Sequence, residues 1–336
     1  MSNNVAVVIL NYNGEKFLQQ FLPNVVTYSQ PHRVIVADNA STDNSKKVVE
    51  QVKGAKWLAL PDNYGYAEGY NKALKQISAE YYVLLNSDVE VTENWLKPLL
   101  NHVEANAEVV ACQPKIKSFH QPGYFEYAGA AGGYLDWMGV PFCRGRIFDT
   151  LEQDHGQYNS SVEVHWATGA CLFVNAAWYW KVGGLDGRFF AHMEEIDLCW
   201  RLRRWGKKIA CIPASQVYHV GGGTLSAESS KKLYLNYRNG WWMLIKNLPK
   251  QKLVSALLAR LAVDKLAAMR WLAKGEAKKA WAIFRAIKHA LGKYGEFRRD
   301  YPQHPEAEVK VYNKSIIAQY FGLKQKTYSQ LPNKPD

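Results

Sequence analysis

Two acidic residues follow directly on an apolar segment, an arrangement that suits a metal site, although an acidic turn after a strand is by itself more often simply solvated. Residues 81–85 read Tyr-Tyr-Val-Leu-Leu, and Asp88 and Glu90 come just after them. A run of this length and composition is typical of a buried strand. Acids at the end of such a strand lie where a parallel sheet opens its ligand crevice. Their oxygens are of the type that holds Mg²⁺ or Mn²⁺ against a substrate phosphate.

A second group of carboxylates begins a segment that should be helical and should end at Gly206. Spacings of three and four residues put Glu194, Asp197 and Arg201 on one helix face, and Glu195 lies beside them. Acids in a first turn are favoured by the helix dipole, so N-terminal capping competes with a catalytic role for Glu194 and Asp197.

His219 precedes a run of glycines at residues 221–223. Glycines mark a backbone that must bend sharply or approach a ligand closely. A lone histidine is more often structural than catalytic, but one that leads a glycine run is a better functional candidate.

The elements that must position these residues alternate along the first hundred residues. Strands are expected at residues 5–10, 33–37, 56–60 and 81–85, with helices at 15–28, from about 44 to 52, and at 66–78. Such alternation predicts a parallel sheet with helices on both faces. Polar residues follow each strand at one edge of this sheet, where ligands bind: Asn11 and Asn13, Asp38 and Asp43, Asn63, and Asp88.

The remaining sequence is less regular and lacks the common phosphate fingerprints. No GxGxxG follows the first strand and no P-loop lysine appears, which disfavours dinucleotide binding and NTPase chemistry. Residues 107–180 are rich in glycine and aromatic residues and predict a mixed extension with a flexible loop near 140–160. A further strand is expected at residues 208–212.

Taken together, the segments resemble the family 2 glycosyltransferases, which are inverting nucleotide-sugar enzymes, and within them the bacterial rhamnosyltransferase-like branch. The resemblance covers roughly residues 4–245, and seven motifs in the family's order make it specific. They are VILNYNG (8–14), VADNASTD (36–43), NYGYAEGYN (63–71), LNSD (85–88), GGLD (183–186), EEIDL (194–198) and YRN (237–239). The implied fold is α/β of GT-A type: a Rossmann-like, mostly parallel sheet with helices on both faces, plus a C-terminal helical extension.

The resemblance also implies a pocket for a nucleoside diphosphate sugar. Asp38 would accept a hydrogen bond from the base, and Asn11 and Asn63 would line the pocket. The other residues implied for this pocket are Asn13, Asn71 and Asn86.

A Mg²⁺ or Mn²⁺ cofactor follows from the same resemblance. Asp88 stands at the metal-binding end of the family's DXD motif, whose first position is Asn86 here. Asn86 can bond ribose or phosphate but adds no charge, which leaves Asp88 as the main anionic ligand. His219 would help to hold the metal or the leaving pyrophosphate.

Glu195 stands where the family commonly has the aspartate of a Glu-Asp pair, the catalytic base. Its extra methylene moves the carboxylate by roughly a bond length, and a misplacement of about 1 Å can be costly. Glu194 and Asp197 therefore stay open as the base. Inverting transfer needs one carboxylate to take the acceptor's proton and a cation to neutralise the diphosphate. A glycosidase would use two carboxylates and no nucleotide pocket.

The positive charge of the chain is concentrated in one segment. Residues 246–300 contain 14 Lys and Arg against 4 Asp and Glu, which is +10 of the net charge of +12. We therefore expect a catalytic domain over residues 1–245 and a basic amphipathic helical extension over 246–336. Apolar residues recur in this extension at Leu257, Leu258, Leu261, Met269 and Trp271, and again at Trp281, Phe284, Ile287 and Leu291.

Basic amphipathic helices with tryptophan and phenylalanine suit an anionic membrane surface, where a lipid-linked acceptor would be presented. The alternative is that the apolar stripes pack on the catalytic domain. No transmembrane segment or signal peptide is apparent, and the five scattered cysteines form neither a zinc nor a disulfide pattern. The expected location is cytoplasmic and peripheral to the cell membrane.

The favoured function is inverting transfer of a sugar to the hydroxyl of a glycan or lipid-linked acceptor in bacterial surface polysaccharide synthesis. A nucleotidyltransferase is the second enzyme class considered. It usually needs a basic, glycine-rich loop after the first strand to hold a triphosphate, but the turn here has no positive charge until Lys16. A nucleic-acid-binding protein, driven by the basic tail, and a non-catalytic sugar-binding relative remain the non-enzymatic alternatives. No nucleic-acid partner is expected.

Overall fold

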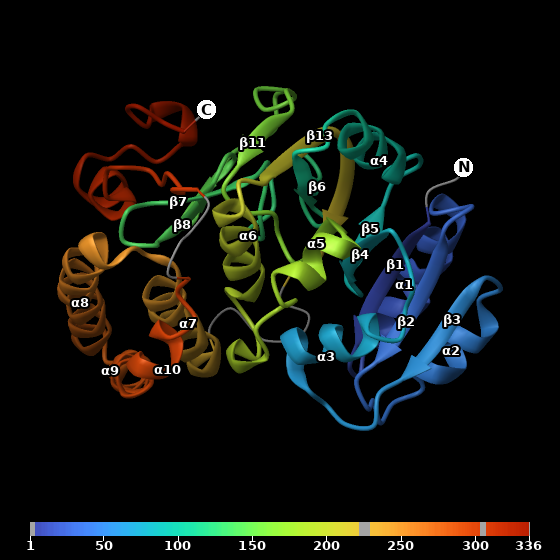
Figure 1. The fold of residues 1–336 in the computed structure, drawn as a ribbon, viewed down its shortest axis with the longest axis horizontal. Coiled ribbons are helices and arrows are strands. Elements are labelled where there is room, and N and C mark those ends of the chain that lie inside the picture. The colour runs from blue at the N-terminus through green and yellow to red at the C-terminus, as the bar shows by residue number, and fades with distance from the viewer. Residues whose placement is uncertain (1–3, 222–228, 303–306, 336) are drawn as a thin grey trace.

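The computed structural model describes residues 4–221, 229–302 and 307–335. Within them a nine-stranded sheet forms the centre, in the order β11-β13-β6-β12-β4-β1-β2-β3, with β5 paired to β13 (Figure 1). The strands are β1 Val5–Asn11, β2 Arg33–Asp38, β3 Ala55–Ala59, β4 Tyr81–Asn86, β5 Val89–Val91, β6 Val109–Ser118, β11 Val162–Val164, β12 Cys171–Asn175 and β13 Lys208–His219. β1 to β4 run parallel to one another, whereas β12 runs antiparallel between β4 and β6.

Helices cover both faces of this sheet, as expected. The α-helices of the described residues are α1 Glu15–Tyr28, α2 Ser45–Gln51, α3 Gly65–Leu74, α4 Leu96–Ala105, α5 Ala176–Lys181, α6 Glu194–Arg204, α7 Ser230–Asn247, α8 Lys250–Ala273, α9 Ala277–Gly292 and α10 Tyr294–Arg298. α8 to α10 pack against α7 and one another and not on the sheet (Figure 1). Side chains alternate between the two faces of a strand. In β1, Val5, Val7 and Ile9 join the core beneath α1, α2 and α4, while Ala6 and Val8 join the core beneath α3 and α6.

A small second sheet replaces the flexible loop that the sequence predicts near residues 140–160, so that prediction is wrong. Its antiparallel strands are β7 Gly133–Leu135, β8 Pro141–Cys143, β9 Arg146–Ile147 and β10 Thr150–Leu151. Phe142, Cys143 and Ile147 are buried in it. Gly145 makes the tight turn possible: its φ is +95°, and a Cβ there would lie 2.5 Å from the ring of Phe125.

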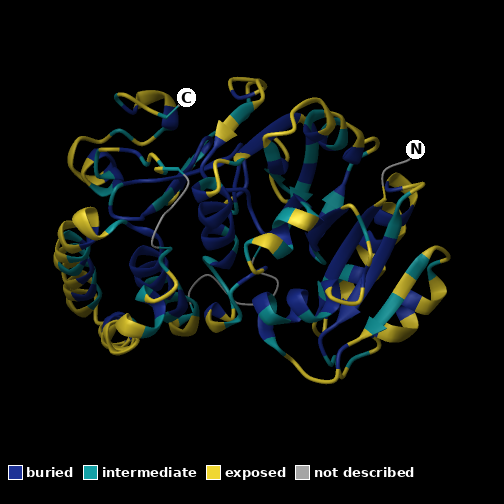
Figure 2. Cartoon of the chain, viewed as in Figure 1, coloured by how far each residue is buried: buried dark blue, intermediate teal, exposed yellow. Residues whose placement is uncertain are grey.

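The C-terminal helices share a core with the rest of the chain. The boundary expected at residue 245 falls inside α7, and Phe297 of α10 stacks on Trp242 of α7 with ring centroids 4.4 Å apart. Residues after α10 return to the second sheet, where Tyr328 stacks on Tyr134. Figure 2 shows the buried strands and the exposed outer side of α8. Among the described residues, no helix has the length and apolarity needed to cross a bilayer.

Candidate functional site

The last residues of β1 and β2 form a buried polar pair at the edge where ligands were expected. Asn11 and Asp38 lie opposite each other in the sheet, and Asn11 Nδ2 donates to Asp38 Oδ1 at 3.0 Å. Ser41 fixes the same carboxylate by donating its backbone N–H at 2.9 Å and its hydroxyl at 2.5 Å. Asn11 Oδ1 has no hydrogen-bond partner in the part of the chain that the structure describes. This edge therefore holds a fixed carboxylate and a buried, unpaired amide oxygen that lies beneath Gly14.

Asn13 and Asn63 lie at the exposed rim of this polar edge. Asn13, which has a φ of 51°, accepts a hydrogen bond from the backbone N–H of Thr42 at 2.8 Å. Asn63 Oδ1 accepts from Asn39 Nδ2 at 3.0 Å. The structure thus brings together four of the six residues expected in the nucleotide-sugar pocket. A fifth, Asn86, ends β4 next to β1.

Asn71 is the exception, because the structure places it in a different environment. Its Oδ1 accepts from the Tyr179 hydroxyl at 2.7 Å and from the backbone N–H of Leu185 at 3.1 Å. Its Nδ2 donates to the carbonyl of Leu185 at 2.6 Å. Both ends of the amide are therefore used in tying α3 to the loop that precedes α6, and a role for Asn71 in the nucleotide-sugar pocket stays a prediction.

Asp88 and His219 meet where β4 and β13 end. His219 Nε2 lies 3.1 Å from Asp88 Oδ1, and its Nδ1 lies 3.1 Å from a carboxylate oxygen of Glu126. Burial by itself lowers the pKa of His219, but the hydrogen bonds and charges of the two carboxylates outweigh burial and raise the pKa to about 10. The imidazole is therefore cationic at neutral pH between two buried acids.

These residues can be tested for their fit to a divalent cation. No group of three or more His, Cys, Asp or Glu side chains in the described ranges is arranged to hold a metal. Magnesium, however, is usually bound through only one or two protein ligands together with substrate phosphates. Two neighbouring octahedral ligands, each about 2.1 Å from an ion, lie about 3 Å apart. The 3.1 Å between Asp88 and His219 is the length of their hydrogen bond and also matches that separation. The pair therefore fits a metal that displaces the proton from His219 Nε2 and takes its other ligands from a diphosphate.

Glu194 and Glu195 open α6, close to the end of β4. The backbone of Gly169 hydrogen-bonds the carboxylate of Glu195, and the adjacent Ala170 carbonyl accepts from the backbone N–H of Asn86 at 3.0 Å. Burial raises the pKa of Glu195 to about 7, although backbone N–H groups oppose the shift. Burial and the neighbouring charge of Glu195 raise the pKa of Glu194 well above its usual value. A carboxylate that titrates near neutrality suits proton transfer.

The loop before these two acids has an unusual backbone. Phe190, His192 and Met193 all have φ near +70°, a conformation that non-glycine residues rarely adopt and that costs on the order of 1–3 kcal/mol each. Asn239 of α7 holds this loop: its Nδ2 lies within 2.7–3.0 Å of the carbonyl oxygens of Phe189, Ala191 and His192. Strain of this kind, held by a fully buried amide, is typical of a functional site.

Asp197 faces away from this pair of glutamates. Its carboxylate is fully buried and accepts from Arg201 at 2.8 Å, from Lys246 at 2.9 Å and from Asn247 at 2.7 Å. Burial alone raises the pKa of Asp197, but these cations and the Asn247 amide hold it far below the usual range. With each oxygen already bonded to a fixed donor, Asp197 is poorly placed to take a proton from a substrate.

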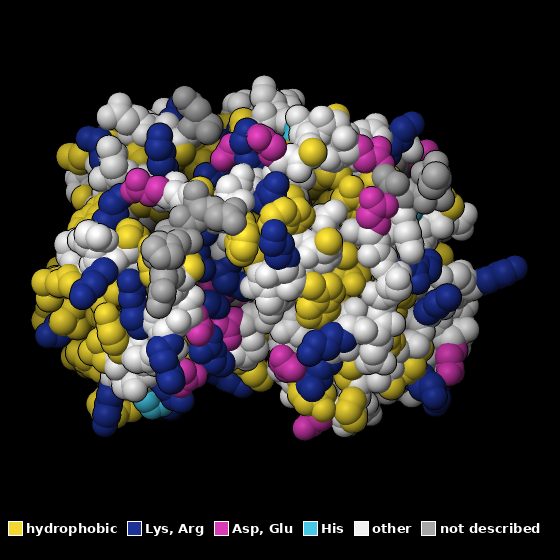
Figure 3. Space-filling model, in the orientation of Figure 1, with side chains coloured by type: hydrophobic (Ala, Val, Ile, Leu, Met, Phe, Trp, Pro, Cys, Tyr) yellow, Lys and Arg dark blue, Asp and Glu magenta, His cyan; other side chains and the backbone are white. Residues whose placement is uncertain are grey.

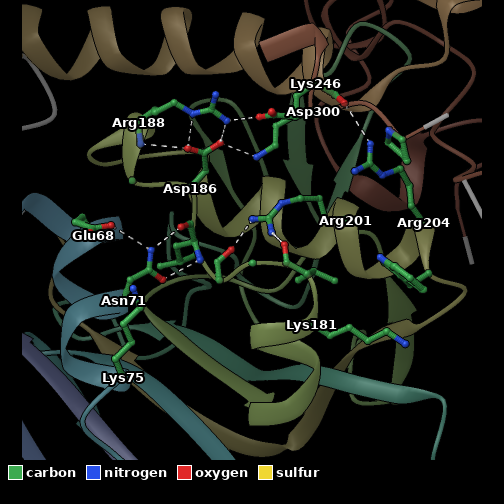
Figure 4. Close-up of a pocket in the computed structure, with 17 residues that line it drawn as sticks. Glu68, Asn71, Lys75, Lys181, Asp186, Arg188, Arg201, Arg204, Lys246 and Asp300 are labelled. Carbon is green, nitrogen blue, oxygen red and sulfur yellow. Dashed lines mark hydrogen bonds and ion pairs between the residues drawn. The ribbon is translucent and has the colours of Figure 1, made fainter. Parts of the chain in front are cut away.

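The same ion pairs line a cavity of about 710 Å³ on the far side of α6 (Figure 4). Asp186 and Asp300 pair there with Arg188, and Asp186 also accepts from Lys246. Asn11, Asp38 and Asp88 are not among the residues of its wall. This cavity is therefore distinct from the polar edge of the sheet.

Three residues of the site were missed at the level of the sequence. Glu126 lies in the irregular region and carries no motif, so nothing in the sequence pairs it with His219. Asn239 stands in the YRN motif, whose presence was noted without a role. Tyr66, in the motif of residues 63–71, donates its hydroxyl to the Gly169 carbonyl at 2.6 Å, next to Glu195.

Comparisons with known proteins agree with this arrangement. The model of the family described as "Glycosyl transferase family 2" matches residues 6–173. The chain is 24% identical to an N-acetylglucosaminyl-diphospho-decaprenol L-rhamnosyltransferase of Mycobacterium tuberculosis over 272 residues, which cover 72% of this chain and 87% of that one. It is also 24% identical to the rhamnosyltransferase WbbL of Escherichia coli over 226 residues, with coverage of 64% and 83%.

Solved structures show the same fold at low identity. The mannosyltransferase PcManGT of Pyrobaculum calidifontis, in complex with GDP-Man and Mn²⁺, aligns with a TM-score of 0.53 at 15% identity over 87% of this chain and 88% of that one. GalNAc-T7 with UDP, GalNAc and Mn²⁺ aligns with a TM-score of 0.56 at 14% identity over 73% and 48%. These likenesses show the GT-A fold. The chain belongs to glycosyltransferase family 2.

Proposed function

We propose that this protein moves a sugar, with inversion, from a nucleoside diphosphate sugar to a hydroxyl of a glycan or lipid-linked acceptor in bacterial surface polysaccharide synthesis. The observation that carries the proposal is the position of Glu195. Its carboxylate, with a pKa of about 7, is bonded by the backbone of Gly169, and the adjacent Ala170 bonds Asn86 at the end of β4, the strand next to β1. A proton acceptor next to a polar crevice for the donor is what glycosyl transfer requires.

In the proposed reaction, the acceptor hydroxyl attacks the anomeric carbon from the face opposite the diphosphate. A new C–O bond forms, the bond from the anomeric carbon to the diphosphate oxygen breaks, and Glu195 takes the hydroxyl proton. Glu194 beside it is also buried, and burial together with the charge of Glu195 raises its pKa. One neutral and one charged carboxyl avoid the repulsion between two adjacent anions.

The donor is proposed to bind along the strand ends. Asp38 would accept a hydrogen bond from the base, with Asn11 and Asn63 beside it, and Asn86 would bond ribose or phosphate. Asp88 and His219 would hold the Mg²⁺ or Mn²⁺ ion, which neutralises charge on the departing diphosphate. The metal dependence is supported by two neighbouring structures of the same fold that contain Mn²⁺.

A deoxyhexose is the proposed sugar, and a lipid diphosphate-linked saccharide the proposed acceptor. Both suggestions are supported by the similarity to two rhamnosyltransferases, one of which is named for a diphospho-decaprenol acceptor. The enzyme would then work at the cytoplasmic face of the membrane.

The test is incubation of the protein with a panel of nucleoside diphosphate sugars and Mg²⁺ or Mn²⁺, with release of the nucleoside diphosphate as the readout. Release that requires one donor and a hydroxyl acceptor is the expected result. Release of inorganic pyrophosphate from a nucleoside triphosphate and a sugar phosphate would instead identify a nucleotidyltransferase. Donor binding without turnover, under every acceptor condition, would identify a sugar-binding relative.

A further inference from the structure

The orientation of α8 is unusual for a helix at the surface of a protein. Its buried residues are Leu253, Ala256, Ala268 and an ion pair between Arg260 and Asp264, in which Arg260 Nε lies 3.0 Å from Asp264 Oδ1. A helix of a water-soluble protein ordinarily buries its large apolar side chains and exposes its charged ones. Here small and charged residues face the protein interior.

Large apolar side chains cover the opposite side of α8. The exposed ones are Val254 at 61%, Leu258 at 64%, Leu266 at 61%, Met269 at 51% and Leu272 at 50%. At about 100° per residue these five fall within roughly one third of the circumference, opposite the buried residues. Of the stripe expected from the sequence, Leu258 and Met269 belong to this face, whereas Leu257, Leu261 and Trp271 are only partly exposed.

α9 extends the apolar surface. Trp281 is 67% exposed, Phe284 36% and Leu291 48%, whereas Ile287, expected to join them, is buried. Eight of the eighteen large hydrophobic side chains exposed in the described residues therefore lie within residues 250–292. Single exposed apolar residues are normal, but a concentration of this kind marks an interaction site.

The charges on the same surface are almost all positive. The only acids from Lys250 to Gly292 are Asp264, which is buried, and Glu276, which pairs with Lys279. Exposed cations surround the apolar side chains at Lys265, Arg270, Lys274, Lys278, Arg285 and Lys288. Figure 3 shows hydrophobic side chains and cations together at the left margin, over α8 and α9.

We propose that the outer faces of α8 and α9 dock this protein on an anionic lipid bilayer, with their apolar side chains in the headgroup region. A bilayer fits both properties of the surface, since exposed aliphatic side chains enter the interface while lysine and arginine meet lipid phosphates. A second copy of the chain would bring like charges together, and nucleic acid would leave the aliphatic face in water. This proposal rests on the proposed function in one respect: a bilayer is where a lipid-linked acceptor would be presented to the enzyme.

The docking surface is also joined to the loop of the site. Tyr234 of α7 hydrogen-bonds His289 of α9 at 2.6 Å, and Asn239, further along the same helix, holds the loop before Glu194. Docking through α8 and α9 would therefore fix the orientation of α7, and with it the position of the acids relative to the bilayer.

The test is flotation of the full-length protein with vesicles of phosphatidylcholine, alone or with one third phosphatidylglycerol, at low and high salt. We expect binding to the anionic vesicles that high salt weakens. Leu258→Gln with Met269→Gln should lower it by at least about ten-fold, because these side chains lose their place in the interface without a change of charge. Lys265→Gln with Arg270→Gln should lower it by about 30-fold at low salt, since each cation near an anionic surface contributes about five-fold.

The matched control is Lys46→Gln with Lys47→Gln, which removes the same charge from exposed positions of α2, at the other end of the molecule (Figure 1). It should float like the parent protein. The melting temperature of each variant shows whether the protein is still folded. Nucleoside diphosphate release without vesicles shows whether it is still active, so that a loss of flotation can be assigned to docking. Binding that none of the variants weakens, or a dimer in solution that Leu258→Gln with Met269→Gln dissolves, would overturn the proposal.

Discussion

Glu195 and Glu194 differ in burial, and the difference favours Glu195 as the proposed base. Both are held at the start of α6, but Glu194 is 4% exposed and its pKa is raised well above the normal value. A carboxyl whose pKa lies near neutrality suits proton transfer, which supports Glu195, with a pKa of about 7, as the proposed base.

Glu195→Gln should lower kcat by about 10²–10⁴-fold, the usual contribution of general-base catalysis, while donor binding is retained. Rates of nucleoside diphosphate release and donor affinity by calorimetry measure the two quantities. The parent enzyme should also lose kcat as the pH falls below about 7, because protonation inactivates the base. A mild Glu195→Gln phenotype together with a severe one for Glu194→Gln would reverse the assignment.

Asp88→Asn should abolish most activity without loss of fold, because the amide keeps the shape and removes the charge that a metal needs. Titration of Mn²⁺ in the presence of a nucleoside diphosphate should show weaker binding, and a chelator should inhibit the parent enzyme. Glu90→Gln is the matched control, since Glu90 is the other acid of the segment but lies in β5, opposite Tyr218. Full activity of Asp88→Asn in excess chelator would contradict the metal role.

The sequence predicts these residues unevenly. Strand ends at one edge of a parallel sheet necessarily converge, so Asn11, Asp38 and Asp88 could be placed from the order of the elements alone. The surroundings of Asn71 could not be predicted in this way. Asn71 lies within α3 and not at a strand end, and its amide bonds the backbone of the distant Leu185. Glu126 could not be placed either, because its contact with His219 is made across 93 residues of chain with no periodic pattern between them.

At the scale of elements, α7 does more than pack against its neighbours, because it also holds the loop that precedes Glu194. Its Asn239 amide is shared among three carbonyl oxygens of the loop that precedes Glu194. A loop with three non-glycine residues at positive φ keeps that conformation only where its surroundings enforce it. We infer that Asn239 is a positioning residue for the two glutamates.

Asn239→Ala should lower kcat by about ten-fold or more, because a shift of about 1 Å in a catalytic group can cost up to 10²-fold. KM for the donor should change less, since the proposed donor pocket lies at the ends of β1 and β2. The acid limb of the pH–rate profile should also move, because the surroundings of Glu195 change. Asn236→Ala is the control: its amide only bonds the Lys232 carbonyl of the same helix. Equal effects of both changes on kcat would argue for a general loss of α7 stability.

Asp197→Asn tests the ion-pair network that joins α6 to α7. Breaking a buried pair costs about 3–5 kcal/mol, so we expect a lower free energy of unfolding at pH 7 with little loss of kcat at temperatures where the fold persists. The folded-state pKa of Asp197 is depressed, so its contribution is present above the unfolded value of about 3.9 and is lost as the pH falls through the folded value.

The stabilities of Asp197→Asn and its parent should therefore converge in acid. Glu163→Gln, which removes the partner of Arg203 in a more exposed pair, should cost less than about 1 kcal/mol. A collapse of kcat in a fully folded Asp197→Asn protein would identify Asp197 as the base.

In the parallel part of the sheet, the spacing of apolar residues in the sequence predicts the helices and strands well. β1, α1, β2 and β4 lie within a residue of their expected bounds, because strands buried on both faces read as continuous apolar runs. The second sheet was missed because strands of two or three residues are too short to show a period. Its burial comes instead from contacts with residues that lie far away in the chain.

For the molecule as a whole, the question is whether residues 1–245 and 246–336 behave as separate domains. The contacts favour one cooperative unit, because the C-terminal residues complete the second sheet. Tyr312 donates its backbone N–H to the Leu135 carbonyl at 2.9 Å, and Ile316 donates to the buried Asp136 carboxylate at 3.0 Å. The ring of Tyr328, which is buried, stacks on Tyr134 at 5.4 Å and on Phe142 at 6.4 Å.

Tyr328→Ala should therefore lower the stability of the entire protein by about 3 kcal/mol, the usual cost of removing a buried aromatic ring, and should do so in a single transition. Scanning calorimetry and the loss of donor binding on heating should report the same midpoint, because the ring packs on β7 and β8, which share a core with the strands of the main sheet. Phe321→Ala, at a side chain 41% exposed, should cost less than about 1 kcal/mol. Two transitions in the Tyr328→Ala protein, with donor binding lost only in the unshifted one, would show that the C-terminal part unfolds independently and that the boundary near residue 245 separates true domains.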